Sequence, residues 1–536
     1  MDHPEQLNSD PVEPRGVPQA GRPSPLRFLW FQLALSAGGG VWWAFCFDQR
    51  PGLLLPLAAA APLFAVAAVP GSAWRRLWLG WLHGTVAWLV AIPWIVGTLE
   101  TYGGVPGIAS ALLLGLLALY LGLYHGLFCW LAGRLLARGD VPALLLVPTV
   151  WVALEWVRGL GPSGFPWNLL AYAWVDVPGA LDVTRWIGSH GLSFLVAATG
   201  LALFRLVGRE SRRGAVAALV AVAALLSTAR WTNLDRRPGD GRRLDVAVVQ
   251  PNIHMATAEM VDGGPDEQFA DLASNYERLF ALSREACEPG RLVVWPESAG
   301  WPYQLERDER FAADLERVVA GGCSLLLNSA RWDRSGQEAR SGKEARAFNA
   351  AYLLTPGLAR ARRQTYDKMH LVPFGEYVPF GGLLPVVRQL ARQAGGFSPG
   401  DEVRLLDVDA ARLGVSICFE IVFPEQVAAR VRRGANLLVT ITNDSWYGRT
   451  WAPHQHLRPA RFRAAENGRP LVRAAITGIS AVIDRRGRVL ADSPIDEALV
   501  MKAQIIPRRG MTPFTRAPLL VPLLCVALAG FAILRR

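Results

Sequence analysis

The chain has 536 residues, of which 51% are apolar and only 19% are charged. A soluble domain usually carries about 25% charged residues, so much of this chain is expected to avoid water. The net charge of +11 comes from 56 Lys and Arg residues, of which only three are Lys. Many of the Arg border apolar runs, which argues against a nucleic-acid-binding protein. The composition therefore predicts an integral membrane protein with an additional domain.

Most of the first half of the chain is predicted to be transmembrane helix. Residues 1–25 contain six Pro and no apolar face, so we expect a disordered tail there. No small-residue cleavage site follows the first apolar run, which is therefore interpreted as a retained anchor. About 20 apolar residues cross the ~30 Å hydrocarbon layer. On this basis an α-helical bundle of about eight transmembrane helices is predicted near residues 26–47, 52–70, 77–97, 107–133, 141–157, 189–207, 214–229 and 517–534.

The distribution of Arg predicts how these helices are oriented, because cytoplasmic loops carry an excess of positive charge. Seven helices fall within residues 26–230 and the eighth within 517–536. With the N-terminus in the cytoplasm, the inside segments hold 13 Arg, against Arg50, Arg158 and Arg185 in the short outside loops. This bias places the long segment between the seventh and eighth helices outside.

That outside segment is expected to contain a soluble α/β domain at residues 244–507, between linkers at 231–243 and 508–516. Short β-branched runs alternate there with charged helical patterns, which indicates strands covered by helices. Strands are predicted at 244–250, 291–295, 323–328, 348–354, 412–418, 435–442 and 471–484, and helices at 266–286, 308–320, 424–433 and 455–467.

Three polar residues stand where predicted strands end. Glu297 lies in VVWPES, Lys368 in YDKMHLVPFGEYVPF, and Cys418 closes GVSIC. Singly, each has a structural interpretation: Glu297 as a helix cap, Lys368 as a surface charge, Cys418 as an inert small apolar side chain. Together they make a workable acyl-transfer set. A thiol attacks as a thiolate or while a base takes its proton, a carboxylate can be that base, and an ammonium can lower the thiol pKa and stabilise an oxyanion.

These motifs and their spacing resemble the nitrilase superfamily, whose Glu–Lys–Cys triad sits on a four-layer αββα sandwich. The resemblance is closer to the bacterial apolipoprotein N-acyltransferase family, in which a nitrilase-like domain stands between the last two of eight transmembrane helices. It covers nearly the whole chain after residue 25. Further matching motifs are VVQPNI at 248–253, EWVRGLGPSGFPW at 155–167, HLVPFGEYVPF at 370–380, TNDSWYG at 442–448 and ENGRPLVRA at 466–474.

The resemblance implies a role for each site residue. Glu297 would be the general base, Lys368 the stabiliser of oxyanion and thiolate, and Cys418 the nucleophile that becomes a thioester. Glu376 and Glu420 match family positions of supporting role. Structural alternatives stay open, in which Glu376 pairs with a framework Arg or Glu420 caps the helix predicted from 424. No cofactor and no metal are expected.

The resemblance also implies substrates and a location. A phospholipid would donate an acyl chain to the thiol, and the N-terminal amine of a diacylglyceryl-Cys lipoprotein would then attack the thioester, as a step of lipoprotein maturation. The protein would lie in the bacterial inner membrane with its catalytic domain on the periplasmic side. A membrane setting suits acyl substrates, because each CH₂ exposed to water costs about 0.8 kcal/mol. No nucleic-acid partner is expected.

Two other functions are open to the same sequence. In a membrane-tethered, nitrilase-like amidase, water would replace the amine acceptor, but eight spans exceed what a tether needs. In a transporter-like bundle, the outer domain would be inactive, which the intact Glu297, Lys368 and Cys418 argue against.

The sequence also departs from the family pattern in three places. Phe419 stands where Tyr is frequent, Ile476 where Asn is expected, and the Trp expected near 258–260 is missing. None of these changes touches the triad, but they concern positions where the acceptor is expected to bind.

Other segments have two interpretations each. Residues 379–397 are either a lid that moves toward lipid or a surface helix. Glu155 and Arg158 either meet a lipid headgroup or form an interfacial pair that anchors their helix. Tyr447 and Trp451 are candidates for an apolar rim of the site.

Overall fold

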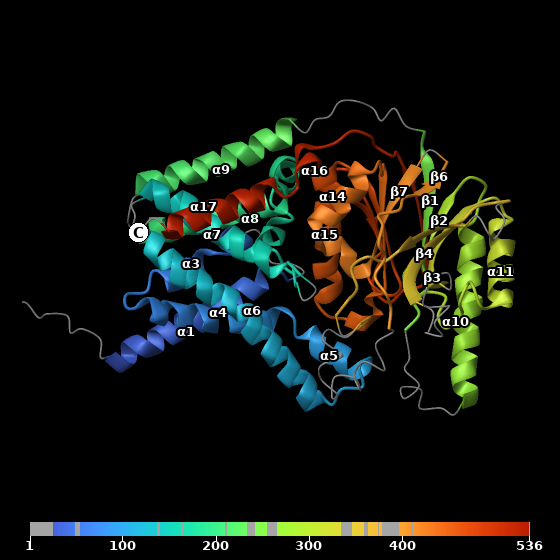
Figure 1. Cartoon of the computed structure of the whole chain (residues 1–536), viewed down its shortest axis with the longest axis horizontal. Coiled ribbons are helices and arrows are strands. Elements are labelled where there is room, and N and C mark those ends of the chain that lie inside the picture. Colours follow the sequence, from blue (N-terminus) through green and yellow to red (C-terminus); the bar gives the residue numbers. More distant parts are fainter. Residues whose placement is uncertain are drawn as a thin grey trace, which may run out of the picture.

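A helical region and a two-sheet sandwich lie side by side in the computed structural model (Figure 1). The predicted tail up to residue 24, the segment near 258–260 and residues 379–395 lie outside the described residues. The structure describes residues 25–48, 54–136, 140–161, 164–208, 212–232, 242–254, 265–333, 346–357, 363–373, 375–377, 396–409 and 411–534.

Helices occupy all of the predicted apolar runs, but two of the runs are broken. Residues 52–70 hold two short helices, and 77–97 is interrupted before Pro93, where the missing N–H ends one helix and another begins. The helices of this region are α1 (Pro25–Phe45), α2 (Leu54–Leu57), α3 (Ala61–Ala67), α4 (Ala73–Ala91), α5 (Trp94–Thr101), α6 (Gly107–Leu135), α7 (Asp140–Arg158), α8 (Ala180–Val207), α9 (Arg212–Thr232) and α17 (Leu520–Leu534).

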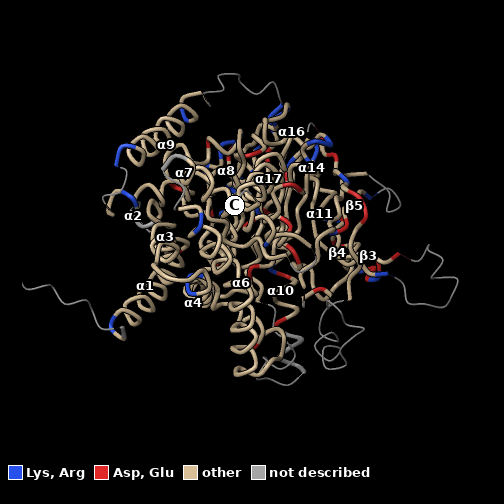
Figure 2. The backbone as a smooth tube through the Cα atoms, turned by 60° about the vertical axis from the view of Figure 1, so that its left-hand side comes forward, with Lys and Arg blue, Asp and Glu red and all other residues tan. Residues whose placement is uncertain are grey.

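Three of the described helices, α6, α8 and α9, are long and apolar enough to cross a membrane. The pair α4 and α5, bent by 55°, provides a fourth span if it counts as one, and α17 is a shorter apolar helix. The predicted number of eight spans is therefore not confirmed by length and composition. Large apolar side chains are exposed along α1, α6, α9 and α17, and Figure 2 shows few charges along them, as expected of surfaces that face lipid.

The sandwich consists of two six-stranded sheets and confirms the predicted α/β domain. Each sheet has a parallel centre with antiparallel strands toward its edges. The first sheet has the order β12-β1-β2-β3-β4-β5, and the second β11-β10-β9-β8-β7-β6. The strands are β1 (Leu244–Gln250), β2 (Leu292–Val294), β3 (Ser324–Asp333), β4 (Arg346–Leu354), β5 (Gln364–Asp367), β6 (Leu406–Val408), β7 (Ala411–Ile417), β8 (Leu437–Thr442), β9 (Leu471–Ala475), β10 (Ala481–Ile483), β11 (Val489–Asp492) and β12 (Leu499–Ile505).

Both faces of the central strands are apolar because both are covered. Along β1, Val246 and Val248 join the core between the two sheets, whereas Ala247 and Val249 join the core under the outer helices. This two-residue alternation is the side-chain period of a strand. It explains why the sequence of β1 shows a continuous apolar run instead of alternating polar positions.

Two helical layers cover the sandwich on opposite sides (Figure 1). The outer layer is α10 (Pro265–Ala286) and α11 (Glu309–Val319). The inner layer is α14 (Pro424–Arg432) and α15 (Ala452–Asn467), which lies between the second sheet and the helical region. One continuous apolar core runs from the helical region through the inner layer to the second sheet. The sandwich is thus fixed to the helical region by packing as well as by its two chain connections.

Two local features were not predicted from the sequence. Cys287, just after α10, forms a disulfide with Cys323, just before β3. The predicted linker 508–516 contains a short helix, α16 (Pro513–Arg516), which packs against α8.

Candidate active site

The structure brings the three predicted residues together where strands of the two sheets end. Glu297 follows β2, Lys368 directly follows β5, and Cys418 directly follows β7. All three are buried, with exposed fractions of 5%, 1% and 8%. Lys368 Nζ lies 3.4 Å from Glu297 Oε1, and the charges of both residues act on the Cys418 thiol.

Lys368 bridges two carboxylates. Its Nζ lies 2.9 Å from Glu376 Oε1 in addition to its contact with Glu297. Glu376 therefore pairs with this lysine, and the predicted alternative of a framework Arg is wrong. Burial alone would lower the pKa of Lys368, but the two carboxylates outweigh it and hold the pKa above its ordinary value. The lysine is a permanent ammonium at neutral pH.

The orientation of Glu297 is set by three donors. Oε1 accepts from Lys368 and from Asn349 Nδ2 at 2.9 Å, and Oε2 accepts from the backbone N–H of Asn443 at 3.2 Å. Asn349 Nδ2 also donates to Glu376 at 2.6 Å, so one amide joins both carboxylates. Glu297 starts no helix, which removes the helix-cap interpretation.

Asn349 is a site residue that the sequence did not identify. Its amide is itself held, because its Oδ1 accepts from Asn328 Nδ2 at 2.6 Å. Asn349 lies in the middle of β4, in the run FNAAYLL, where no motif distinguishes it. Only the pairing of strands far apart in the sequence brings it to Glu297.

Cys418 has a backbone conformation that few residues adopt. It opens a short 3₁₀ helix, η4 (Cys418–Val422), directly after β7, and its φ is +52°. A residue other than Gly in this left-handed region costs about 1–3 kcal/mol, and such strain gathers at functional sites. A nucleophile on a strained strand-to-helix turn is presented to the substrate in the same way in other acyl-transfer enzymes.

The resting form of Cys418 is the neutral thiol. Burial raises its pKa, the carboxylate of Glu297 raises it further, and the opposing effect of Lys368 does not reverse the shift. The sequence left two routes open, a preformed thiolate and a thiol that loses its proton during attack. This environment favours the second, with Glu297 as the neighbouring base.

Glu420 connects the lysine and cysteine segments. Its buried carboxylate accepts from the backbone N–H groups of Ile417 at 2.9 Å and Met369 at 2.8 Å, each adjacent to a triad residue. It also forms an ion pair with Arg430 at 3.0 Å. These contacts contradict the alternative of a cap for α14 and make Glu420 a brace between the two sheets.

An aromatic stack links the nucleophile to the helical region. The ring of Phe419 lies 6.5 Å from that of Phe165 and 6.3 Å from that of Trp167, both stacked and both from the segment after α7. Of the two predicted rim residues, Tyr447 packs against Trp94, with ring centroids 4.8 Å apart, and Trp451 packs against α1. The side of the site next to the helical region is therefore apolar and aromatic.

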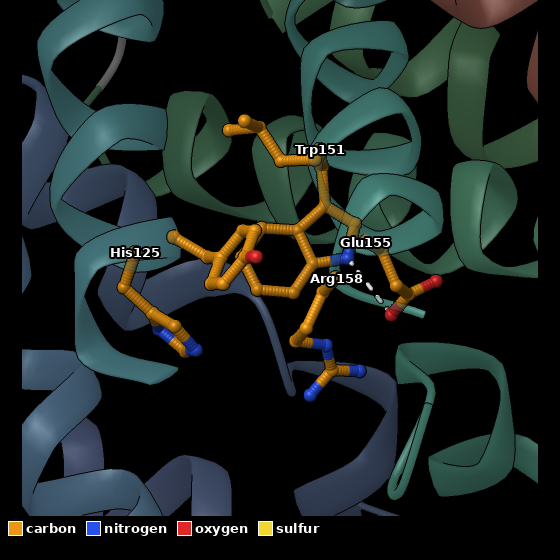
Figure 3. Close-up of a pocket in the computed structure, with 6 residues that line it drawn as sticks. His125, Trp151, Glu155 and Arg158 are labelled. Atoms are coloured by element: carbon orange, nitrogen blue, oxygen red, sulfur yellow. Dashed lines mark hydrogen bonds between the residues drawn. The ribbon is translucent and has the colours of Figure 1, made fainter. Parts of the chain in front are cut away.

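Glu155 and Arg158 lie inside the helical region, each only 4% exposed, and line a small cavity (Figure 3). Glu155 Oε1 accepts from Leu170 N at 2.7 Å, and the Arg158 guanidinium lies over the ring of Trp88 at 4.7 Å. Both side chains are thus buried within the protein, and a position at the membrane interface stays a prediction. The carbonyl of Arg158 accepts from the N–H of Phe165 at 2.9 Å, which ties this cavity to the aromatic stack.

Two further expectations concern the departure from the family pattern at Ile476 and the binding of metal. Ile476 is fully buried in the core under the outer helices, and its carbonyl accepts from Asn252 N at 2.9 Å, so it serves packing between the sheets' ends. Within the described part of the chain, no group of three or more His, Cys, Asp or Glu is arranged to hold a metal ion.

Comparison with known proteins assigns both parts of the chain. The family model described as the apolipoprotein N-acyltransferase N-terminal domain matches residues 38–202, and the carbon-nitrogen hydrolase model matches residues 245–509. An apolipoprotein N-acyltransferase of Geobacter metallireducens is 36% identical over 500 residues, which cover 91% of this chain and 92% of the relative. One from Photobacterium profundum is 31% identical over 474 residues, 86% of each chain. Among solved structures, a Nesterenkonia amidase of the nitrilase superfamily covers 50% of this chain and 92% of its own, at 20% identity and a TM-score of 0.35.

Proposed function

The chain belongs to the apolipoprotein N-acyltransferase family, and we propose that it works through an acyl thioester formed on Cys418. It is an acyltransferase of the carbon-nitrogen hydrolase superfamily that serves lipoprotein maturation. The observation that carries the thioester proposal is the position of the Cys418 thiol. The charges of Glu297 and Lys368 both act on it, and the ring of the next residue, Phe419, stacks on the aromatic side chains that lead to the helical region.

In the first half-reaction, a phospholipid is the acyl donor. Glu297 takes the thiol proton as the sulfur attacks the ester carbonyl carbon, and the ammonium of Lys368 stabilises the resulting oxyanion. The carbon–oxygen bond of the ester then breaks. The departing lysophospholipid oxygen receives the proton from Glu297, and the acyl chain remains on Cys418 as a thioester.

In the second half-reaction, the N-terminal amine of a diacylglyceryl-Cys lipoprotein attacks the thioester carbon. The new amide bond forms as the carbon–sulfur bond breaks, and Glu297 carries the surplus proton from the amine to the sulfur. Glu376 supports this cycle by holding Lys368 in place, and Glu420 by fixing the backbone beside Cys418. The enzyme returns to its resting thiol form.

The proposal includes a bacterial inner-membrane location with eight passages and a periplasmic catalytic domain. The helices α9 and α17 support it, because they connect the sandwich to the far end of the helical region, where α9 begins at Arg212 and Arg213 (Figure 1). The Cys287–Cys323 disulfide also supports an oxidising compartment for the sandwich. Both substrates carry acyl chains, so a site that opens toward the bilayer spares them exposure to water.

The test uses the purified full-length protein, a phospholipid with a labelled acyl chain and a diacylated lipopeptide. We expect label on the protein in a hydroxylamine-sensitive bond, transfer of that label to the lipopeptide, and loss of both in Cys418→Ala. Release of free fatty acid without any acylated peptide would instead identify a hydrolase of the amidase type. Label retained by Cys418→Ala would refute the thioester assignment.

A further inference from the structure

The backbone of the nucleophile is held on both sides. The backbone N–H of Ile417, the residue before Cys418, donates to Glu420. The carbonyl oxygen of Cys418 itself lies 3.3 Å from Nε2 of His456, a fully buried residue of α15. Since Cys418 has a φ of +52°, these two contacts flank a residue whose backbone conformation the fold must hold against its own preference.

The other ring nitrogen of His456 belongs to a buried charge network. Nδ1 lies 3.2 Å from Asp444 Oδ1 and 3.3 Å from Arg473 Nη2, and the same Arg473 nitrogen binds Asp444 Oδ2 at 2.6 Å. The Asp444–Arg473 pair already balances its own charge. Burial, and then the nearby Arg473, lower the pKa of His456, so the ring is neutral. A neutral ring carries one proton, so it donates either from Nε2 to the Cys418 carbonyl or from Nδ1 to Asp444 Oδ1; in the first form Nδ1 accepts from Arg473 Nη2.

The face of the same ring touches the helical region. Trp167 packs on it with ring centroids 5.5 Å apart. The neighbouring residue Gln455 points the other way: its Oε1 accepts from Trp167 Nε1 at 2.8 Å, and its Nε2 donates to the carbonyl of Ala91, the last residue of α4, at 2.9 Å. Two adjacent side chains of α15 therefore face the two halves of the protein.

We infer that His456 is a positioning residue for the nucleophile, which holds the carbonyl of Cys418 through Nε2 and thereby keeps the thiol aimed at Glu297. This role rests on the proposed thioester chemistry. Arg473, itself held by Asp444, fixes the ring from behind, and Trp167 fixes its face. The ring touches neither reacting group, so it sets the rate of attack and leaves the affinity for lipid unchanged.

Two amide substitutions separate this role from a purely structural one. In His456→Gln, the side-chain amide nitrogen reaches the position of Nε2 and can donate to Cys418. In His456→Asn, the side-chain amide reaches only the position of Nδ1, where its nitrogen can donate to Asp444 or its oxygen can accept from Arg473. The Gln variant restores the contact with the nucleophile and the Asn variant restores the contact with the charge network.

The measurement is the rate of thioester formation by the full-length protein with labelled phospholipid, at increasing lipid concentration, beside the thermal midpoint of each variant. We expect His456→Asn to lower the maximal rate about 10- to 100-fold with an unchanged KM, because small misplacements of a nucleophile cost rates of that order. His456→Gln should stay much closer to wild type although it is the less stable of the two. Activity and stability are thus expected to rank in opposite order.

Gln455→Met is the matched control on the same helix, since it removes contacts to the helical region only. We expect it to change the KM for lipid more than the maximal rate. Equal losses in the Gln and Asn variants of His456, or an activity order that follows thermal stability, would overturn the positioning role. If His456→Asn does not fold, a loss in His456→Gln as large as that expected for Asn would do so. A wild-type protein that forms no thioester would instead refute the proposed function.

Discussion

The outer and inner helical layers cover the same sandwich but bury different kinds of side chain. In the outer layer, α11 buries apolar residues such as Phe311 and Leu315 and turns its charged residues to water. In the inner layer, α15 is buried on almost every side, although it carries Gln455, Arg463 and Glu466. The inner helix has to bury polar groups because the helical region covers the side that would otherwise face solvent.

Some of these buried polar groups of α15 have partners across the junction, and others have them within the helix. Arg463 pairs with Glu466 at 2.8 Å, and the same carboxylate accepts from the N–H of Ser189 in α8 at 2.7 Å. A buried charge without such partners would cost several kcal/mol, so these contacts depend on both halves being in place. The comparison teaches that polarity on the outer layer serves solubility, whereas polarity on the inner layer serves attachment and catalysis.

The largest effect on activity is expected from Lys368, at the end of the sandwich where the triad lies. Lys368→Met removes the ammonium between Glu297 and Glu376 and leaves two buried carboxylates without their cation. We expect thioester formation to fall about 100- to 1,000-fold, the usual cost of losing an oxyanion donor. The rate is measured with labelled phospholipid.

Lys502→Met is the matched control. Lys502 is a half-exposed lysine of β12 that pairs with Glu288 and not with a triad residue. It should react at the wild-type rate. A Lys368→Met variant that keeps most of its activity would show that the buried ammonium has no part in the chemistry.

An effect on stability rather than on activity is expected from the inner layer itself. Arg463→Met leaves Glu466 buried without its partner, which should cost about 3–5 kcal/mol. The free energy of unfolding, or the thermal midpoint in detergent, measures this. The double variant Arg463→Met with Glu466→Leu should recover part of the loss, since it removes both charges. A single variant as stable as wild type would contradict the view that α15 polarity holds the junction.

The smallest effect is expected in the outer layer. Replacing Cys287 and Cys323 by Ser opens the disulfide between α10 and β3, across a sequence separation of 36 residues, and should destabilise the sandwich by about 2–4 kcal/mol. Thioester formation at low temperature should not change, because the disulfide lies where β3 begins, whereas Glu297 follows the end of the parallel strand β2. A loss of activity in the fully folded variant would show that the outer layer also affects catalysis, which contradicts the distinction between the two layers.

The sequence predicted the long strands better than the short ones. Buried runs such as β1 and β8 were located nearly to the residue, because both of their faces are apolar. The strands β5, β6, β11 and β12 were missed, since they are short or half-exposed and carry little pattern. The run predicted at 471–484 is two strands, β9 and β10, that turn back on each other.

The site was predictable only where local motifs mark it. Glu297, Lys368 and Cys418 each follow a strand within a recognisable motif, and the structure brings them together. Asn349 and His456 could not be found, because each acts on a residue more than 30 positions away in sequence and nothing local identifies either one. The contacts that position the triad come from strand pairing and from burial of α15, which a single sequence does not specify.

The most direct test of the account is the mass of the peptide that contains Cys418, after the purified full-length protein is mixed with a phospholipid and no acceptor. The account predicts one acyl chain on that cysteine, removed by hydroxylamine or by the diacylated lipopeptide. An unmodified Cys418 in a preparation that still acylates the lipopeptide, or an acyl chain on another residue, would contradict it.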